Sequence, residues 1–321
     1  MKASALHRRA VLGAIGALMA TPAFAQSVKP VIGVLMVVSA DPDQYLKAFR
    51  AGLKERGYVE GQNFVIEVRK ARSDQSDLPA LAAELVALKV DVIVAVLTQA
   101  VLAAKAATKD IPIVAYAGDM LGSGLAASLA RPGGNITGVT SLSPETSAVR
   151  VDLLRQIVPG LRRLGLVYNE VDPLHAIFLD HYALAGKKLG IELAPVAARP
   201  GAAFEPVFAR VAEARVDAMW IQPSLYRKEI ADLLPRTPIP AMGDTRWIAD
   251  NGGLLGMGAG EDRLKQQLAD FTVRILKGAK PADLPIQQPV KFELVINART
   301  AARLGLTIPP LVIGQADEVI E

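Results

Sequence analysis

Val31-Ile-Gly-Val-Leu-Met-Val37 is an uninterrupted apolar run, which predicts a β-strand buried on both faces. Residues 43–56 follow it with apolar side chains at four-residue intervals, the spacing of one helix face. A second apolar run, at residues 90–96, precedes an alanine-rich helical segment at 98–108. Buried strands that alternate with helices are typical of parallel α/β sheets joined by right-handed crossovers.

The same alternation continues along the rest of the chain. The isolated helix predicted at 262–276 lies between two strands and is hard to place in a single sheet. It therefore indicates a chain that recrosses between two lobes. The remaining predicted strands are 63–68, 113–117, 164–168, 191–197, 218–221, 239–243, 254–258 and 291–296, and the remaining predicted helices are 77–88, 123–130, 145–158, 174–189, 203–214, 226–234 and 298–304.

Composition excludes several classes of function. The chain has 321 residues, 51% of them hydrophobic, and no cysteine, so disulfides, thiolate nucleophiles and cysteine-held zinc or iron–sulfur clusters are excluded. Its net charge is +4, but the first 25 residues carry three basic and no acidic residues. Without them, 33 basic residues face 32 acidic ones, a net charge of about +1. No electrostatic footprint for nucleic acid is therefore expected.

Residues 1–25 have the pattern of a signal peptide. Lys2, Arg8 and Arg9 precede an apolar stretch at residues 10–20, and the segment ends in Ala23-Phe-Ala25, a small-x-small cleavage site. The stretch is shorter than the roughly 20 apolar residues that span a bilayer, although a membrane anchor or a buried helix is the alternative interpretation. The adjacent arginines fit twin-arginine export, but general-secretion leaders also carry such pairs.

Motifs for catalysis are largely missing. Gly256-Met-Gly-Ala-Gly260 lacks the spacing and position of a dinucleotide fingerprint, and Leu121-Gly-Ser-Gly124 lacks the spacing of a nucleophile elbow. His175 and His181 are six residues apart, whereas a zinc pair on one helix face needs four. The pattern predicts two surface histidines on a helix and neither a metal nor a cofactor.

Polar residues instead follow the ends of the predicted strands in both halves of the chain. In open α/β sheets ligands bind outside the carboxyl ends of the strands, and the helix N-termini there suit a carboxylate group. Asp119 or Asp244 could pair with an ammonium group. Helix caps and turns favour the same residue types, which is the alternative reading for each position. The candidates are Ser39, Asp41, Thr98, Gln99, Gly118, Asp119, Asn169, Gln222, Ser224 and Asp244.

Several longer stretches, in the order in which they occur, resemble a known family across nearly the whole chain after the leader. They resemble the solute-binding proteins of ABC importers, in the branch similar to tryptophan/tyrosine importers with the type I periplasmic-binding fold. The stretches include Phe49-Arg-Ala-Gly-Leu-Lys-Glu-Arg-Gly-Tyr-Val-Glu-Gly61, Leu129-Ala-Arg-Pro-Gly-Gly-Asn-Ile-Thr-Gly138, Ile275-Leu-Lys-Gly-Ala-Lys-Pro-Ala-Asp-Leu-Pro285 and Lys291-Phe-Glu-Leu-Val-Ile-Asn297.

The resemblance implies two doubly wound parallel-sheet lobes joined by three hinge crossings. Lobe one would comprise residues 28–141 plus 258–285, and lobe two residues 142–257 plus 286–321, with crossings near Thr140, Met257 and Gln287. It also adds Thr140 and Ser141 to the candidate site. A small molecule, with an amino acid or small carboxylate favoured, would bind between the lobes.

The implied protein is a periplasmic, monomeric receptor that docks transiently on a membrane permease, without nucleic acid, cofactor or lipid anchor. Two alternatives stay open at this point. A sensory receptor of the same fold would serve a signalling partner in place of a permease. A secreted α/β enzyme would need a nucleophile–base pair or a metal cluster, and neither is evident in the sequence.

Overall fold

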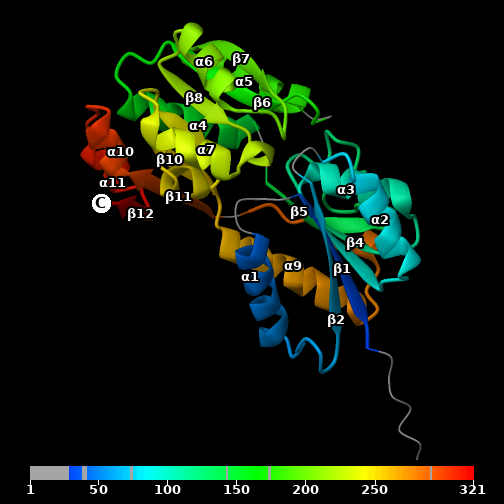
Figure 1. Ribbon diagram of the computed structural model, residues 1–321. Coiled ribbons are helices and arrows are strands. Elements are labelled where there is room, and N and C mark those ends of the chain that lie inside the picture. Colours follow the sequence, from blue (N-terminus) through cyan, green and yellow to red (C-terminus); the bar gives the residue numbers. More distant parts are fainter. Residues whose placement is uncertain (1–28, 38–41, 73–74, 142–143, 173–174, 290) are drawn as a thin grey trace, which may run out of the picture.

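The chain forms two separate β-sheets, each covered by helices on both faces (Figure 1). The computed structural model describes residues 29–37, 42–72, 75–141, 144–172, 175–289 and 291–321. We call the first sheet with its helices the first lobe, and the second sheet with its helices the second lobe. The predicted signal peptide lies outside the described residues.

The first sheet has five parallel strands in the order β2-β1-β3-β4-β5. β1 lies next to the centre and pairs with β2 on one side and β3 on the other, as expected for a strand that is apolar throughout. The strands are β1 (Val31–Val37), β2 (Val65–Ala71), β3 (Val92–Val96), β4 (Ile113–Ala117) and β5 (Ile136–Thr140).

Side chains of β1 alternate between two apolar clusters, one on each face of this sheet. Val34 packs with Phe49 of α1 and Leu268 of α9 on one face. Leu35 packs with Leu85 of α2 and Val101 of α3 on the other face. This two-faced burial is why an uninterrupted apolar run is needed there. The helices are α1 (Pro42–Glu55), α2 (Leu78–Ala87), α3 (Thr98–Ala107) and α9 (Glu261–Leu276).

The second sheet has seven strands in the order β12-β11-β10-β9-β8-β6-β7. All pairs are parallel except β10 with β11, which is antiparallel. The strands are β6 (Arg163–Asn169), β7 (Glu192–Ala198), β8 (Ala218–Ile221), β9 (Ala241–Gly243), β10 (Leu255–Ala259), β11 (Phe292–Asn297) and β12 (Glu318–Ile320).

Helices cover this sheet on both faces as well. Trp220 of β8 packs with Leu154 of α4 and Tyr182 of α5 on one face, and its neighbour Met219 packs with Val207 of α6 on the other. The α-helices are α4 (Pro144–Ile157), α5 (His175–Leu189), α6 (Glu205–Glu213), α7 (Lys228–Leu233), α8 (Trp247–Asp250), α10 (Ala298–Arg303) and α11 (Pro310–Ile313), and the 3-10 helices of the chain are η1 (Pro223–Leu225), η2 (Leu234–Arg236) and η3 (Pro281–Asp283).

The chain passes between the two lobes three times. It leaves the first lobe after β5, returns after β10 to form α9, and leaves again before β11 (Figure 1). On the last passage Gln287 runs beside β5: its backbone N–H donates to Gly138 at 2.9 Å, and its carbonyl accepts from Thr140 at 3.0 Å. Helix α9 packs on the first sheet through Leu268, so the late helix belongs to the first lobe, as the family resemblance implied. The exact lobe boundaries stay a prediction.

The structure corrects the sequence reading at several elements. The helix predicted at 123–130 is absent, because Gly124 adopts a left-handed φ of 64° and residues 119–126 form successive turns. The sequence predicted a parallel sheet in the second lobe, but strand β11 runs antiparallel to its neighbour β10. Strands β5 and β12 and helix α11 were not predicted from the sequence.

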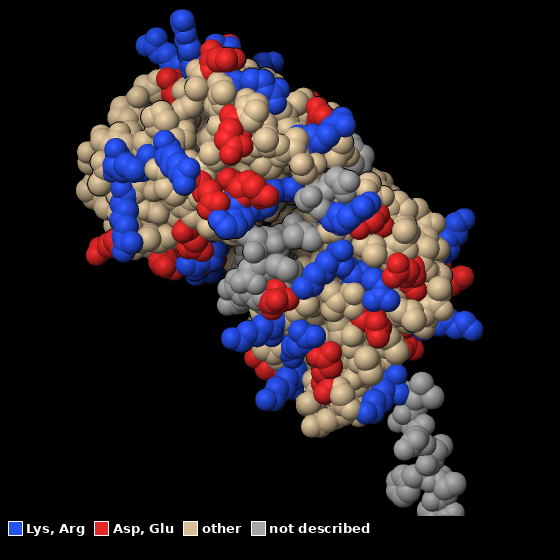
Figure 2. All heavy atoms as spheres, viewed as in Figure 1, with Lys and Arg blue, Asp and Glu red and all other residues tan. Residues whose placement is uncertain are grey.

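Charged side chains of both signs are interspersed over the surface visible in Figure 2, on both lobes. This mixed distribution fits the near-balanced composition of the chain after residue 25. Within the described residues, no helix is both long and apolar enough to cross a membrane.

Candidate functional site

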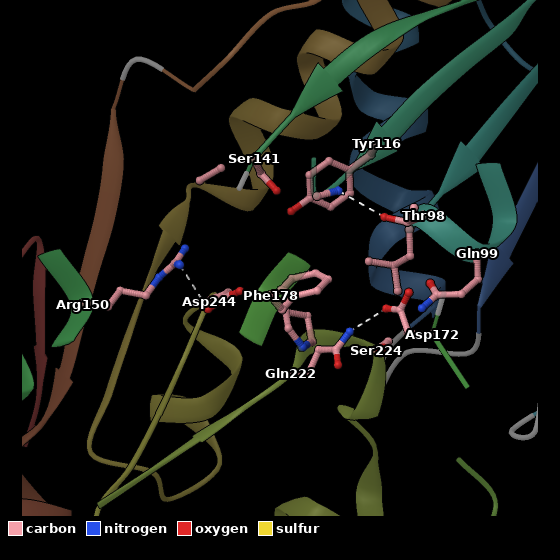
Figure 3. Close-up of a pocket in the computed structure, with 14 residues that line it drawn as sticks. Thr98, Gln99, Tyr116, Ser141, Arg150, Asp172, Phe178, Gln222, Ser224 and Asp244 are labelled. Atoms are coloured by element: carbon pink, nitrogen blue, oxygen red, sulfur yellow. Dashed lines mark hydrogen bonds and ion pairs between the residues drawn. The ribbon is translucent and has the colours of Figure 1, made fainter. Parts of the chain in front are cut away.

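A pocket lies between the two lobes at the carboxyl ends of their strands (Figure 3). The space between its walls is about 510 Å³, open solvent at its mouth included. Its position is the one expected for a ligand site in open α/β sheets. The first lobe contributes Leu97, Thr98, Gln99, Tyr116, Gly118 and Ser141, and the remaining lining residues are Arg150, Asp172, Phe178, Gln222, Pro223, Ser224, Asp244 and Ala259.

The first-lobe wall is built where β3 turns into α3. Leu97 has a φ of 73°, a conformation that residues other than glycine rarely adopt, and this tight turn starts α3 at the pocket. The hydroxyl of Thr98 accepts a hydrogen bond from the Gly118 N–H at 3.2 Å, which ties the end of β3 to the loop after β4. The next side chain, Gln99, is buried, yet neither of its amide atoms has a hydrogen-bond partner among the described residues.

Two predicted residues on this side stabilise the wall and do not line the pocket. The buried hydroxyl of Thr140 donates to the Gly118 carbonyl and accepts from the Met120 N–H at 3.2 Å. The Asp119 carboxylate accepts from the N–H groups of Leu121 and Gly122 at 3.0 and 2.8 Å. Asp119 is therefore the centre of a turn, the alternative that its residue type left open, and not a wall of the pocket.

On the second lobe, an amide network holds the side chains that line the pocket. Asn169 is fully buried; its backbone N–H donates to Gln222 Oε1 at 2.8 Å, and its side-chain Nδ2 donates to the Ser224 hydroxyl at 3.3 Å. Gln222 Nε2 in turn donates to the carboxylate of Asp172, which is 2% exposed. Asn169 thus positions Gln222 and Ser224 from behind the pocket surface.

A buried ion pair lies across the pocket from Asp172 (Figure 3). Arg150 Nη1 is 3.3 Å from Asp244 Oδ1, and the two side chains are only 2% and 11% exposed. Burial is the largest single effect and disfavours the charged guanidinium, but Asp244, Tyr182 and Tyr226 together outweigh it, so the pKa of Arg150 lies above its usual value. Asp244 also accepts from Trp220 Nε1 at 2.8 Å. Its charge is therefore already matched by protein groups.

The loop that carries Asp244 is fixed by close backbone packing and by Arg246. A Cβ on Gly258 would lie 1.7 Å from the Asp244 carbonyl oxygen, and one on Gly256 would lie 2.1 Å from the Thr245 carbonyl oxygen. The first two glycines of the G-x-G-x-G motif therefore let the loop lie against β10, which is a structural role.

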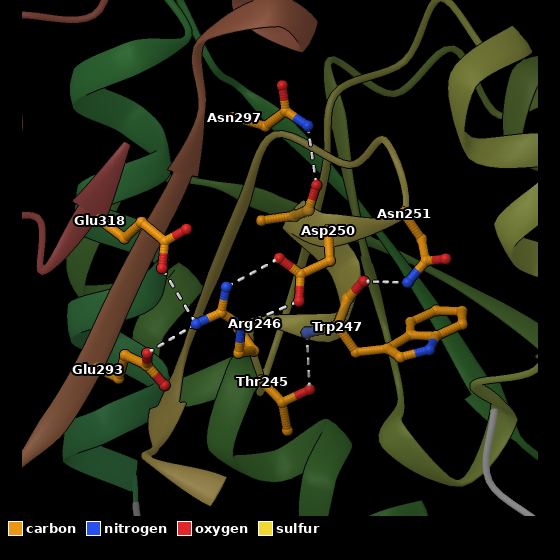
Figure 4. Close-up of polar contacts among 9 residues, drawn as sticks. Thr245, Arg246, Trp247, Asp250, Asn251, Glu293, Asn297 and Glu318 are labelled. Atoms are coloured by element: carbon orange, nitrogen blue, oxygen red, sulfur yellow. Dashed lines mark hydrogen bonds and ion pairs between the residues drawn. The ribbon is translucent and has the colours of Figure 1, made fainter. Parts of the chain in front are cut away.

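Figure 4 shows the Arg246 guanidinium among three carboxylates, from α8, β11 and β12. It contacts Asp250 at 2.9 Å, Glu293 at 3.2 Å and Glu318 at 3.1 Å. The hydrogen bond to Asp250, and after it the one to Glu318, raises the pKa of Arg246 despite partial burial. The loop that carries Asp244 is thus joined to the outer strands of the second sheet.

The structure brings together seven of the predicted site residues, Thr98, Gln99, Gly118, Ser141, Gln222, Ser224 and Asp244, at one pocket. Asp119, Thr140 and Asn169 lie behind its surface, and Ser39 and Asp41 lie outside the described residues. Sequence reasoning missed Tyr116, Arg150, Asp172 and Phe178. The prediction that His181 lies at the surface was also wrong, because this residue is only 8% exposed.

Replacing Asp119 with alanine should destabilise the protein without weakening ligand binding. Losing two backbone hydrogen bonds of the turn should lower the free energy of unfolding by about 1–2 kcal/mol, while ligand affinity stays within about threefold. Urea unfolding and isothermal titration calorimetry measure the two effects. Asp217→Ala is the matched control, because Asp217 accepts from two backbone N–H groups far from the pocket, both at 2.8 Å. A tenfold affinity loss in Asp119→Ala alone would return Asp119 to the ligand site.

Comparison with known proteins gives a family match over almost the whole described chain. A family model described as ABC transporter substrate binding protein matches residues 31–320. The "Tyrosine-binding protein" of Clostridioides difficile (strain R20291) is 24% identical over 270 residues, covering 82% of this chain and 77% of the relative.

Solved structures agree with this match. An ABC domain from Streptococcus pneumonia in complex with L-Trp is 28% identical, with a TM-score of 0.82, and the match covers 91% of this chain and all of the other. A leucine binding protein from Thermotoga maritima is 16% identical, with a TM-score of 0.53 and coverage of 80% and 78%. The second likeness concerns the fold alone, and it confirms the predicted two-lobed periplasmic-binding architecture.

Proposed function

This chain belongs to the family of ABC transporter substrate-binding proteins, and from that premise we propose that its pocket captures an α-amino acid with an aromatic side chain. The family consists of solute-binding proteins and is not a family of enzymes. In this proposal the ligand is bound and released without chemical change.

The observation that carries the proposal is that side chains from both lobes line one pocket. Tyr116 on β4 of the first lobe and Phe178 on α5 of the second both face it. A ligand in contact with both lobes gains its full set of contacts only when the lobes are close together. Its binding therefore shifts the population toward the closed form, with the three chain crossings acting as the hinge.

The aromatic preference follows from the walls of the pocket. The rings of Tyr116 and Phe178 are large apolar surfaces, and aromatic rings pair favourably with other rings in stacked or tilted arrangements. Phe178 is itself held by Trp220, with ring centres 6.0 Å apart, so its position is fixed before ligand binds. The tyrosine and tryptophan named for the two relatives fit the same surface.

The ammonium group of the ligand is assigned to Asp172 and not to Asp119 or Asp244. Asp119 serves a turn, and Asp244 is matched by Arg150 and Trp220. The charged lining residues are Arg150, Asp172 and Asp244, which sum to one negative charge and favour a ligand that carries a positive group.

Delivery to a membrane permease completes the proposed function. The closed, loaded form would dock on the permease and release the ligand to it. Residues 1–25 would direct export to the periplasm, where the mature chain would act as a monomer. Uptake of radiolabelled ligand by cells measures this role. If deletion of the gene stops the uptake and the full chain restores it, the result supports transport over sensing.

A thermal-shift series tests the ligand class directly. With 1 mM ligand, a micromolar site raises the melting temperature of a protein of this size by about 5–10 °C. We expect this shift for tryptophan or tyrosine, a smaller one for phenylalanine and leucine, and none for sugars. A shift with sugars alone would overturn the proposal. The processed chain from Gln26 is the protein to use, because the predicted signal peptide is not part of the receptor.

A further inference from the structure

Gln99 and Gln222 are the two side-chain amides that line the pocket, and they differ in their hydrogen bonding. Gln99 is 9% exposed, and within the part of the chain that the structure describes neither its Oε1 nor its Nε2 has a hydrogen-bond partner. At Gln222, in contrast, Oε1 accepts from the Asn169 N–H and Nε2 donates to Asp172. A buried amide with both atoms unsatisfied is costly, so its retention in a pocket indicates that something else completes its bonds.

Its position in the fold directs Gln99 at the ligand. It is the second residue of α3, a ten-residue helix whose start at the strained Leu97 has no side-chain cap. The first turn of such a helix presents free N–H groups and partial positive charge, which attract a carboxylate. Figure 3 shows the Gln99 amide pointing toward the Asp172 carboxylate from the opposite lobe.

We infer that Gln99 is a specificity-determining residue that recognises the charged head group of the ligand. Gln99 and Asp172 together bind the ammonium group. This inference rests on the proposed function and names the group recognised. Asp172 in its ionised form can only accept hydrogen bonds, and Gln99 Oε1 can only accept. A group that satisfies both must carry more than one N–H, which a protonated amine does.

The remaining atom of the amide fits the same head group. Gln99 Nε2 can only donate, and the neighbouring helix start also offers donors, so both suit the carboxylate beside the amine. Gln99 thus distinguishes an amino acid from a simple carboxylic acid of the same shape. Because Gln99 and Asp172 come from different lobes, the amine also links the two lobes in the closed form.

Matched ligands measure this role. We expect the wild-type protein to bind tryptophan about 100-fold more tightly than indole-3-propionate, which lacks only the amine. In Gln99→Met, tryptophan binding should weaken about tenfold and the preference should contract to about tenfold. Tyrosine and 3-(4-hydroxyphenyl)propionate serve as a second pair, measured by calorimetry in the same way.

The melting temperature of the ligand-free variant separates recognition from structure. Gln99→Met should melt at the wild-type temperature or higher, because it removes two unsatisfied buried atoms. Gln222→Met, which breaks two hydrogen bonds, should melt several degrees lower. A drop in Gln99→Met as large as that in Gln222→Met would assign Gln99 a structural role and overturn the inference.

The outcomes distinguish the two proposals. If wild-type protein binds no amino acid, the proposed function fails. If the wild-type protein binds amino acids, the inference alone fails in two cases: Gln99→Met weakens the binding of tryptophan and of indole-3-propionate equally, or it weakens the binding of neither. Asp172→Asn supplies the second arm: it should also reduce the preference for the amine, and an unchanged preference there would equally contradict the shared ammonium site.

Discussion

Arg150→Met should lower the free energy of unfolding by about 3–5 kcal/mol, because it leaves the Asp244 carboxylate buried without its positive partner. Arg150 Nε also donates to the Met257 carbonyl at 2.7 Å, and that carbonyl would lose its bond. Methionine fills much of the space of the arginine stem, so the effect reports the lost charge more than a cavity. Urea unfolding of the ligand-free protein measures it.

Two further variants make the Arg150 prediction specific. Arg155→Met, on the same helix, should cost less than about 1 kcal/mol, because Arg155 is half exposed and its ion pair with Asp152 is at the surface. Arg150→Met combined with Asp244→Asn should recover at least half of the loss, since no unpaired carboxylate remains. A double variant as unstable as Arg150→Met alone would show that packing, and not charge, dominates at this pair.

Gly258→Ala should lower the free energy of unfolding about as much as Arg150→Met does, although it adds only one methyl group. The new Cβ would lie 1.7 Å from the Asp244 carbonyl oxygen, and backbone must move to relieve the overlap. Overpacking of this kind costs about 3 kcal/mol or more when the neighbour cannot yield, and Arg246 restrains this loop. Any protein that folds should bind ligand at least tenfold more weakly, because Asp244 lines the pocket.

Gly260→Ala is the matched control within the same motif. The nearest atom to a Cβ at this position is Glu293 Oε2, 3.9 Å away, so the methyl group meets no overlap. The change should lower the free energy of unfolding by at most about 1 kcal/mol, because it removes a glycine that is favourable at the N-cap of α9. Equal damage from the two substitutions in urea unfolding would contradict the close-packing explanation.

Much of the fold could be predicted from the sequence because its strands carry a strong local signal. Val31–Val37 is apolar at every position and lies buried between helices on both faces. Strand β5 was missed because Ile136-Thr-Gly-Val-Thr140 has only two large apolar residues, and its burial depends on β4 and α9. The antiparallel direction of β11 was also beyond local patterns, since both strand directions show the same alternation.

The candidate site was predicted in part for a similar reason. Residues directly after a strand are found by position, as Thr98 and Asp244 were. Asp172 was missed because it lies three residues beyond the end of β6, although following the loop as far as the next helix would have included it. Arg150 looks like an ordinary arginine on a helix surface, and Tyr116 looks like an ordinary residue of a buried strand.

The resemblance to a known family implied that the late helix returns to the first lobe. By itself the sequence determined the α/β alternation, a chain that recrosses between two lobes, and the general place of the pocket. These depend on local periodicity and on where strands end, which each segment carries in its own residues. Only the tertiary structure decided which polar groups are available to a ligand. Asp119 and Asp244 are both carboxylates after strands, yet one is bonded by a turn and the other by Arg150, whereas no described residue bonds the amide of Gln99. That difference arises from partners distant in sequence, whose approach no local pattern encodes.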